Sequence, residues 1–123
     1  MTESDIAWAA GVFEGEGSVG VSGKSKAPVT YMSMGMSEQD VLDRFTSIVG
    51  TGKVYGPYKG QGSKTPAHYK PMFHWKIRQI TEIQRILRLF YPYLGERRRS
   101  EAAGVIASYY ETLRLPQRAR KAY

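Results

Sequence analysis

Apolar and polar positions change their period several times along the chain, and each change indicates a new element. Alternation with a period of two predicts strands over residues 18–22, 29–36, 53–55 and 68–78. Recurrence every three to four residues predicts helices up to about residue 14, from 40 to 49, from 82 to 91 and from 95 to 113. Hairpins therefore alternate with helices, and two helices follow the last strand.

Side chains that accept hydrogen bonds stand where three of these helices begin. Thr2 or Ser4 can cap the first helix, Ser37 opens a capping-box-like start of the second, and Thr81 is expected to cap the third. Gly50 ends the second helix, since glycine readily adopts the left-handed conformation of a helix end.

The period also assigns faces to the elements. The inward side chains are expected to be Val19, Val21, Met32, Met34, Met36, Tyr69, Phe73, Trp75, Ile77, Ile83, Ile86, Leu87, Phe90, Ala102, Ile106, Tyr109 and Leu113. Pro71 cannot donate a ladder hydrogen bond, so we expect a bulge or an edge position there. The opposite face of residues 68–78 carries His68, Lys70, Met72, His74, Lys76 and Arg78.

These elements predict an α+β fold of order αββαββαα. One four-stranded antiparallel sheet would have helices on one face and solvent on the other. A chain of 123 residues fits a single domain over 1–123, with a core of about 4–114 and a basic tail over 115–123.

Positive charge is concentrated in two segments. The chain has 18 basic and 11 acidic residues, a net charge of +7. Residues 17–36 and 52–78 lack acids, and their basic residues are Lys24, Lys26, Lys53, Lys59, Lys64, Lys70, Lys76 and Arg78. Interspersed signs are usual for a merely soluble face, so this separation favours a polyanionic partner.

Composition excludes several classes of protein. Cysteine is absent, which excludes disulfide scaffolds, thiolate metal sites and cysteine nucleophiles. No apolar run reaches the length of a membrane span or a signal sequence, so we expect a soluble, intracellular protein without a membrane partner. The compartment, whether bacterial or phage cytoplasm or an organelle, stays open.

The first helix carries an unusual strip of small residues. Ala7, Gly11 and Gly15 are spaced four apart and form the glycine strip, along which another helix could approach closely. Interior glycines each cost about 1 kcal/mol against alanine, so a bland core helix would not favour this pattern. Glu14 and Glu16 follow at the negative end of the helix dipole, where a cation would offset their repulsion. The pattern predicts two crossing helices with acids gathered at one end to bind a metal ion.

The segment Ala9–Gly17 resembles the LAGLIDADG motif of homing endonucleases. In that register, glycines stand at the third and ninth positions and acids at the sixth and eighth, although alanine replaces the first leucine and both acids are Glu rather than the commoner Asp. The element order is also similar, as are residues 50–55, 75–77 and 91–94. The resemblance covers residues 4 to 113.

The resemblance implies a sequence-specific double-strand DNA endonuclease that acts as a homodimer and leaves 3′ overhangs. Glu16 would be the catalytic acid and would hold Mg²⁺ together with the carbonyl of Gly15; Mn²⁺ could substitute, and Ca²⁺ would support binding without cleavage. Arg97 aligns with a basic active-site residue of the family. No nucleotide cofactor is expected. The dimer interface would comprise Ala7, Ala10, Gly11, Glu14 and Gly15.

Duplex DNA would lie on the open face of the sheet and on its loops. The candidate contacts are Ser22, Lys24, Lys26, Tyr31, Ser33, Lys53, Tyr55, Lys59, Lys64, His68, Lys70, His74, Lys76 and Arg78. The alternatives are a non-catalytic DNA-binding regulator or an RNA maturase with the same fold, and an unrelated RNA-binding domain, which would need more stacking aromatics on that face.

Overall fold

The computed structural model describes residues 1–22, 29–58 and 70–113, except the side chains of 111–113. The elements are α1 (Glu3–Glu16), β1 (Gly17–Ser22), β2 (Val29–Met36), α2 (Gln39–Val49), β3 (Lys53–Tyr58), β4 (Met72–Ile77), α3 (Ile80–Phe90), a 3-10 turn η1 (Tyr91–Tyr93) and α4 (Glu96–Leu113). The predicted order αββαββαα is confirmed.

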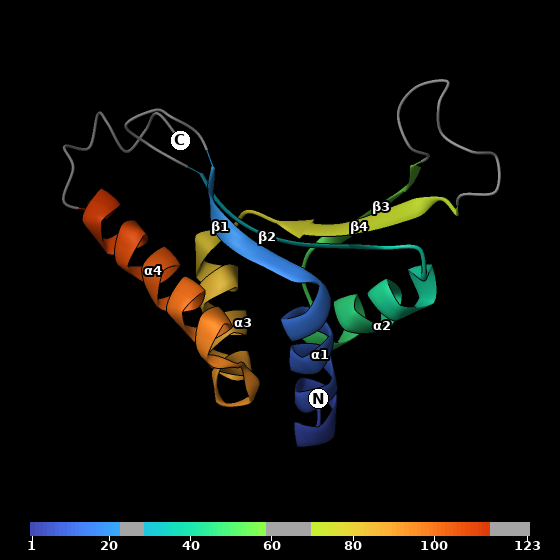
Figure 1. Ribbon diagram of the computed structural model, residues 1–123, viewed down its shortest axis with the longest axis horizontal. Helices are drawn as coiled ribbons and strands as arrows, with labels where there is room; N and C mark the ends of the chain where they lie inside the picture. Colours follow the sequence, from blue (N-terminus) through green and yellow to red (C-terminus); the bar gives the residue numbers. More distant parts are fainter. Residues whose placement is uncertain (23–28, 59–69, 114–123) are drawn as a thin grey trace.

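The strands form one antiparallel sheet of order β1-β2-β4-β3. All four helices lie beneath one face of this sheet, and the other face is open (Figure 1). The predicted α+β class is therefore confirmed. Among the described residues, no helix is long and apolar enough to cross a membrane.

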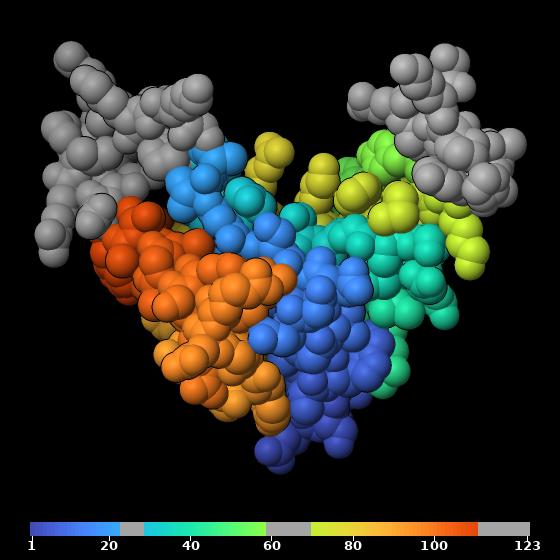
Figure 2. Space-filling view, viewed as in Figure 1, coloured from blue at the N-terminus to red at the C-terminus, as the bar shows by residue number. Residues whose placement is uncertain are grey.

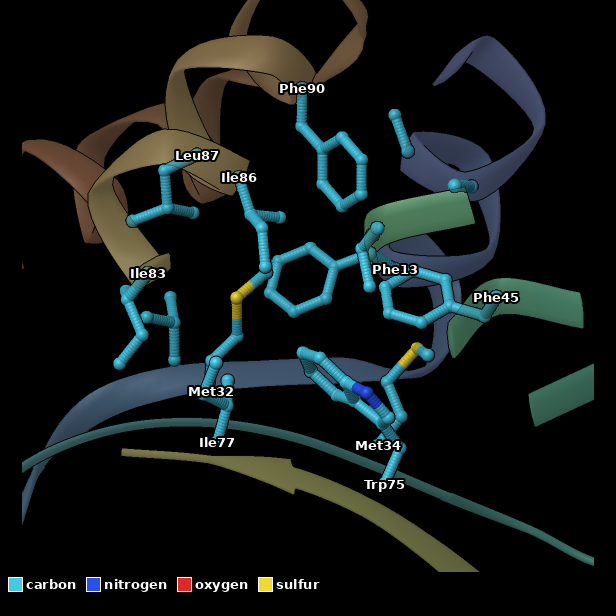
Figure 3. Packing of buried hydrophobic residues seen from close by; sticks show 14 of the residues in the cluster. Phe13, Met32, Met34, Phe45, Trp75, Ile77, Ile83, Ile86, Leu87 and Phe90 are labelled. Atoms are coloured by element: carbon cyan, nitrogen blue, oxygen red, sulfur yellow. The ribbon is translucent and has the colours of Figure 1, made fainter. Parts of the chain in front are cut away.

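The core lies between the sheet and the helices because the apolar positions follow the predicted periods. Met32, Met34 and Met36 of β2 are buried beneath the sheet, as are Trp75 and Ile77 of β4. The four apolar positions predicted for α3 are all buried as well: Ile83, Ile86, Leu87 and Phe90. Figure 3 shows side chains from the helices meeting those of β2 and β4 in one cluster.

Aromatic rings connect the layers of this core. Phe45 of α2 meets Trp75 edge-on with ring centroids 4.9 Å apart, and it meets Phe90 of α3 at 5.9 Å. Phe13 of α1 lies 5.9 Å from Phe90 (Figure 3). One chain of rings therefore joins the sheet to three helices, and it ends on α1 just before the predicted catalytic acid.

The helix starts confirm one predicted cap and correct two. Thr2 caps α1 in a full capping box with Asp5, whose pKa is lowered mainly by the hydrogen bond from the Thr2 backbone. The cap of α2 is Glu38, not Ser37, and it makes no side-chain capping bond. Helix α3 begins at Ile80, so Thr81 lies inside its first turn. Both corrections are shifts of one or two residues, within which capping patterns do not fix a boundary.

The strand boundaries also differ from the prediction. Strand β4 begins at Met72, so Pro71 immediately precedes the strand and is neither a bulge nor an edge residue within it. Strand β3 runs on to Tyr58, with an irregularity in its pairing between Tyr55 and Tyr58. Val21 was expected inside but is exposed, and it lies near the end of β1, an edge strand of the sheet.

Helix α4 buries a different residue from the one predicted. Ala102 is buried as expected, but the next buried position is Val105 rather than Ile106. Ile106 and Tyr109 are each half-buried. Leu113 lies where side chains are not described. The buried stripe of α4 is thus rotated by one residue from the predicted one, since both Val105 and Ile106 are apolar and the period cannot choose between them.

Candidate nucleic-acid interface and metal site

Glu16 is the last residue of α1, and β1 begins with the next residue. Its side chain is exposed and makes no hydrogen bond or ion pair within the part of the chain that the structure describes. Gly17 allows this abrupt change of direction, because a Cβ there would collide with the ring of Phe13. The carboxylate of Glu16 is therefore free to bind a ligand at the place where helix and sheet meet (Figure 1).

The end of α1 and the beginning of α4 exchange charged groups. The backbone N–H of Gly95, just before α4, donates to the carboxylate of Glu14 at 3.0 Å. In the other direction, Nε of Arg98 in α4 donates to the backbone carbonyl of Glu14 at 3.4 Å. We call Glu14, Gly95 and Arg98 the reciprocal clamp.

The reciprocal clamp complements both helix dipoles. A carboxylate lies at the positive N-terminal end of α4, and a guanidinium lies at the negative C-terminal end of α1. Arg98 thus supplies at least part of the positive charge that the sequence indicated for this end of α1. The other carboxylate oxygen of Glu14, Oε2, is buried and has no hydrogen-bond partner among the described residues.

Arg97, the predicted basic active-site residue, is highly exposed. Three-quarters of its side chain is accessible (75%), and its only ion pair among the described residues is a long one of 3.8 Å to Glu101. Arg98 beside it was not singled out by the sequence, yet it is buried, with 7% of its surface accessible. In a run of three arginines, the sequence does not indicate which side chain turns inward. The contact of Arg98 with the end of α1 could therefore not be predicted from the pattern.

The glycine strip faces away from the core of its own chain. Gly11 and Gly15 are exposed and Ala7 is partly exposed. A Cβ added at either glycine would have no described atom within 4 Å beyond its own helical turn. Ala10, by contrast, is completely buried in the core, so the assignment of its side chain to a dimer interface is wrong. Ala10 lies on the opposite side of α1, where it packs inside the chain.

The open face of the sheet carries the predicted polar residues in register. Ser33 pairs with Lys76, which pairs with Lys53, and these three side chains form one row across β2, β4 and β3. His74 pairs with Tyr55 in the same way. No acid occurs in the four strands, so the two facing lysines have no opposite charge within the sheet.

Aromatic side chains lie over glycines of neighbouring strands on this face. A Cβ at Gly20 would come within 3.0 Å of the Tyr31 hydroxyl, and a Cβ at Gly35 would come within 2.8 Å of the His74 ring. The Tyr58 ring is 5.6 Å from that of His74. These packed rings limit side-chain freedom on the open face before any ligand binds.

The open face is also hollowed. A cleft of about 420 Å³ is lined by Tyr55, Tyr58, Lys76, Ile77 and Arg78. A second of about 230 Å³ extends from Lys76 and Arg78 toward Ser22, Tyr31 and Ser33. Figure 2 shows the surface dipping over the middle of the sheet between its two ends.

The remaining predicted contacts fall into two groups. Lys70 is exposed just before β4, beyond the paired rows of the sheet. Lys24, Lys26, Lys59, Lys64 and His68 lie outside the residues that the structure describes.

The donors at the end of α1 suit a hard cation. Carboxylate and carbonyl oxygens are the ligands that Mg²⁺ prefers, and it commonly keeps several waters and takes phosphate oxygens besides one or two carboxylates. Within the described ranges, no group of three or more His, Cys, Asp or Glu residues could hold a metal. The exposed Glu16 carboxylate and the Gly15 carbonyl fit Mg²⁺ only as part of a larger ligand set.

Comparison with known proteins identifies the fold. No family model matches the sequence, and no curated protein matches it. Among solved structures, the homing endonuclease I-CvuI in complex with its target is 19% identical, with a TM-score of 0.63, over 82% of this chain and 62% of that one. The group I intron-encoded homing endonuclease I-CeuI complexed with DNA is 15% identical, with a TM-score of 0.67, over 86% and 54%.

A third structure, the I-LtrWI LAGLIDADG homing endonuclease bound to target DNA, is 18% identical, with a TM-score of 0.64, over 91% of this chain and 38% of that one. The chain spans less than two-thirds of the length of each of these proteins. The arrangement of helices beneath an antiparallel sheet is shared along most of the present chain. The protein therefore has the fold of the LAGLIDADG homing endonucleases.

Proposed function

We propose that the protein is a sequence-specific double-strand DNA endonuclease that acts as a homodimer with Mg²⁺ and leaves 3′ overhangs. The observation that carries this proposal is the free Glu16 carboxylate at the end of a helix whose glycine strip is uncovered. The structures with the same fold include homing endonucleases bound to DNA, which supports the choice of substrate.

The homodimer follows from the glycine strip. If two copies of α1 meet along Ala7, Gly11 and Gly15, their backbones can approach closely, and a C2 axis brings the two Glu16 side chains together. One chain would supply a single acid of this kind, whereas a double-strand cut hydrolyses two phosphodiester bonds, one in each strand. Each Glu16 would then serve one strand of the duplex.

The DNA would lie on the open face of the sheet. A two-stranded ribbon fits the major groove, and the row that contains Lys53 and Lys76 presents cations without any acid in the strands. Tyr31, Ser33 and His74 supply polar atoms that can read base edges. The exposed Lys70 and Arg78 would contact phosphates, which adds affinity without sequence preference.

Hydrolysis would take place where α1 ends. Glu16 and the Gly15 carbonyl would hold Mg²⁺, which when bound lowers the pKa of an attacking water and offsets charge on the leaving oxygen. Arg97 has an exposed guanidinium that would donate hydrogen bonds to a phosphate oxygen near the cut. Mn²⁺ would substitute for Mg²⁺, and Ca²⁺ would support binding without cleavage.

Substitution of Glu16 tests the proposal. A target is first selected from a library of randomised sites, and cleavage of a plasmid that carries it is then measured in Mg²⁺ and in Ca²⁺. Glu16→Gln should lose cleavage while its affinity for the target in Ca²⁺ stays close to that of the wild type. Glu38→Gln changes an exposed acid at the start of α2 in the same way, and it should cut normally.

The outcome separates the endonuclease from its rivals. If Glu16→Gln cuts the plasmid as fast as the wild type, Glu16 is not the catalytic acid and the proposal fails. If the wild type binds its selected duplex but never nicks it in any divalent cation, the protein is a DNA-binding regulator. Preference for RNA over duplex DNA would favour the maturase.

A further inference from the structure

Arg98 is buried, and removing its charged guanidinium from water is energetically unfavourable. Its side chain is 8% exposed, and its guanidinium carbon lies 5.5 Å from the centre of the Phe13 ring. Burial of an ion costs several kcal/mol before its partners compensate, and a well-packed apolar side chain of similar volume is often as stable. A gain in fold stability therefore does not by itself explain why an arginine occupies position 98.

Its hydrogen bonds are directed at the end of α1. Nε donates to the carbonyl of Glu14 at 3.4 Å, while the Nη1 atom donates to Glu101 at 3.0 Å. Glu101 lies one turn further along α4 and fixes the plane of the guanidinium. A planar group held by two directional bonds can hold a backbone atom in place far better than a flexible chain.

The last turn of α1 needs such support. The final carbonyls of a helix have no partner within the helix, so its end frays unless other groups bind them. Here Gly15 and Gly17 flank Glu16, and glycines restrict the backbone least. The reciprocal clamp holds residue 14 by its carbonyl and by its side chain, two residues before the carboxylate that we assign to the metal.

We propose that Arg98 is a positioning residue that fixes the last turn of α1 and thereby places the Glu16 carboxylate and the Gly15 carbonyl for metal binding. This inference rests on the proposed function. Arg98 does not touch the metal or the DNA in this role; it acts through the backbone of Glu14. Loss of groups that orient metal ligands typically lowers metal affinity or activity by about 10- to 100-fold.

Arg99 provides the matched control. It is the next residue of α4, and it also donates to backbone carbonyls, those of Tyr91 and Pro92 at 3.1 and 3.2 Å. Its bonds support η1 instead of α1. Arg98→Met and Arg99→Met therefore remove the same charge and similar hydrogen bonds from two different places.

The experiment compares the two variants on the selected DNA target. We measure the Ca²⁺ affinity of the uncleaved protein–DNA complex by calorimetry, and kcat and KM for cleavage across a range of Mg²⁺ concentrations. Arg98→Met should weaken Ca²⁺ affinity and lower kcat by about 10-fold each, with KM for DNA unchanged. Arg99→Met should match the wild type in all three quantities.

Two results would overturn the inference. One is a folded Arg98→Met protein with wild-type Ca²⁺ affinity and kcat, and the other is an equal loss in Arg99→Met. If Arg98→Met does not fold, Arg98→Lys decides: it keeps the charge but lacks the planar fork, so it should weaken Ca²⁺ affinity several-fold, and wild-type affinity would refute the role.

The same measurements keep this inference apart from the proposed function. If the wild type cuts DNA and the Glu16→Gln variant no longer binds Ca²⁺, the proposed function stands whatever the Arg98 variants show. If the wild type does not cut DNA and the Glu16→Gln variant still binds Ca²⁺, both proposals fail together.

Discussion

Lys53 and Lys76 face each other across β3 and β4 with no acid in either strand. Directly opposed like charges destabilise an antiparallel pair, so the free protein gains nothing from this arrangement. A polyanion on the open face would reverse the balance, because each lysine could then neutralise a phosphate. At the scale of single residues, the proposed DNA contact would therefore turn an unfavourable pair into a favourable one.

Lys76→Gln should separate the two effects. The free energy of unfolding of this variant should be higher by about 0.5 kcal/mol at low salt, because the repulsion between the two lysines is removed. It should also bind DNA more weakly, and the slope of log association constant against log salt should fall in magnitude by about 1. Urea unfolding and binding titrations at several salt concentrations measure both. Arg88→Gln, which changes an exposed residue of α3, is the control and should leave the slope unchanged. If the slope is also unchanged in Lys76→Gln, Lys76 does not contact the DNA.

At the scale of elements, α1 combines two opposite faces on one helix. Phe13, Ala9 and Ala10 are buried in the core, whereas Gly11 and Gly15 leave an uncovered strip. Since a Cβ at Gly11 would have no atom of the described residues within 4 Å beyond its own helical turn, packing among those residues does not require glycine there. The partner helix that we propose would explain why a residue that weakens the helix occupies this position.

Two substitutions at Gly11 should therefore have opposite consequences. Gly11→Ala should stabilise the monomer by up to about 1 kcal/mol through helix propensity, and Gly11→Leu should abolish the dimer by preventing close approach of the two backbones. Sedimentation equilibrium measures the dimer, and thermal unfolding measures the stability. Gly104→Leu is the control, because Gly104 is also an exposed helical glycine whose added Cβ would have no described atom within 4 Å beyond its own helical turn. Should Gly11→Leu still dimerise, the glycine strip is not the interface.

At the scale of the whole molecule, periodicity was sufficient for the order of elements and for most of the core. The alternation in β2 and the helical spacing of α3 are each repeated over enough residues to fix a face. Single-residue choices could not be predicted in the same way. Val105 rather than Ile106 is buried, and Arg98 rather than Arg97 turns inward, because tertiary packing chooses between neighbours that the pattern treats as equal.

The aromatic chain through the core makes a last prediction about the whole molecule. Phe45 is fully buried and contacts both Trp75 of the sheet and Phe90 of α3, so its loss should loosen the sheet and the helices together. Phe45→Ala should cost about 3–5 kcal/mol, a large share of the roughly 5–15 kcal/mol that stabilises a domain. During urea unfolding, circular dichroism measures the loss of the helices. Tryptophan fluorescence measures exposure of side chains that include Trp75 of β4.

We expect the two transitions to shift to lower urea by the same amount and to stay coincident, since one cluster supports both layers. Phe73→Ala is the control: Phe73 lies in the same strand as Trp75 but is only partly buried, so its loss should cost less. If fluorescence and circular dichroism separated in Phe45→Ala, the sheet and the helices would unfold independently. The end of α1 could then move relative to the open face, and a fixed distance between Glu16 and bound DNA would lose its structural basis.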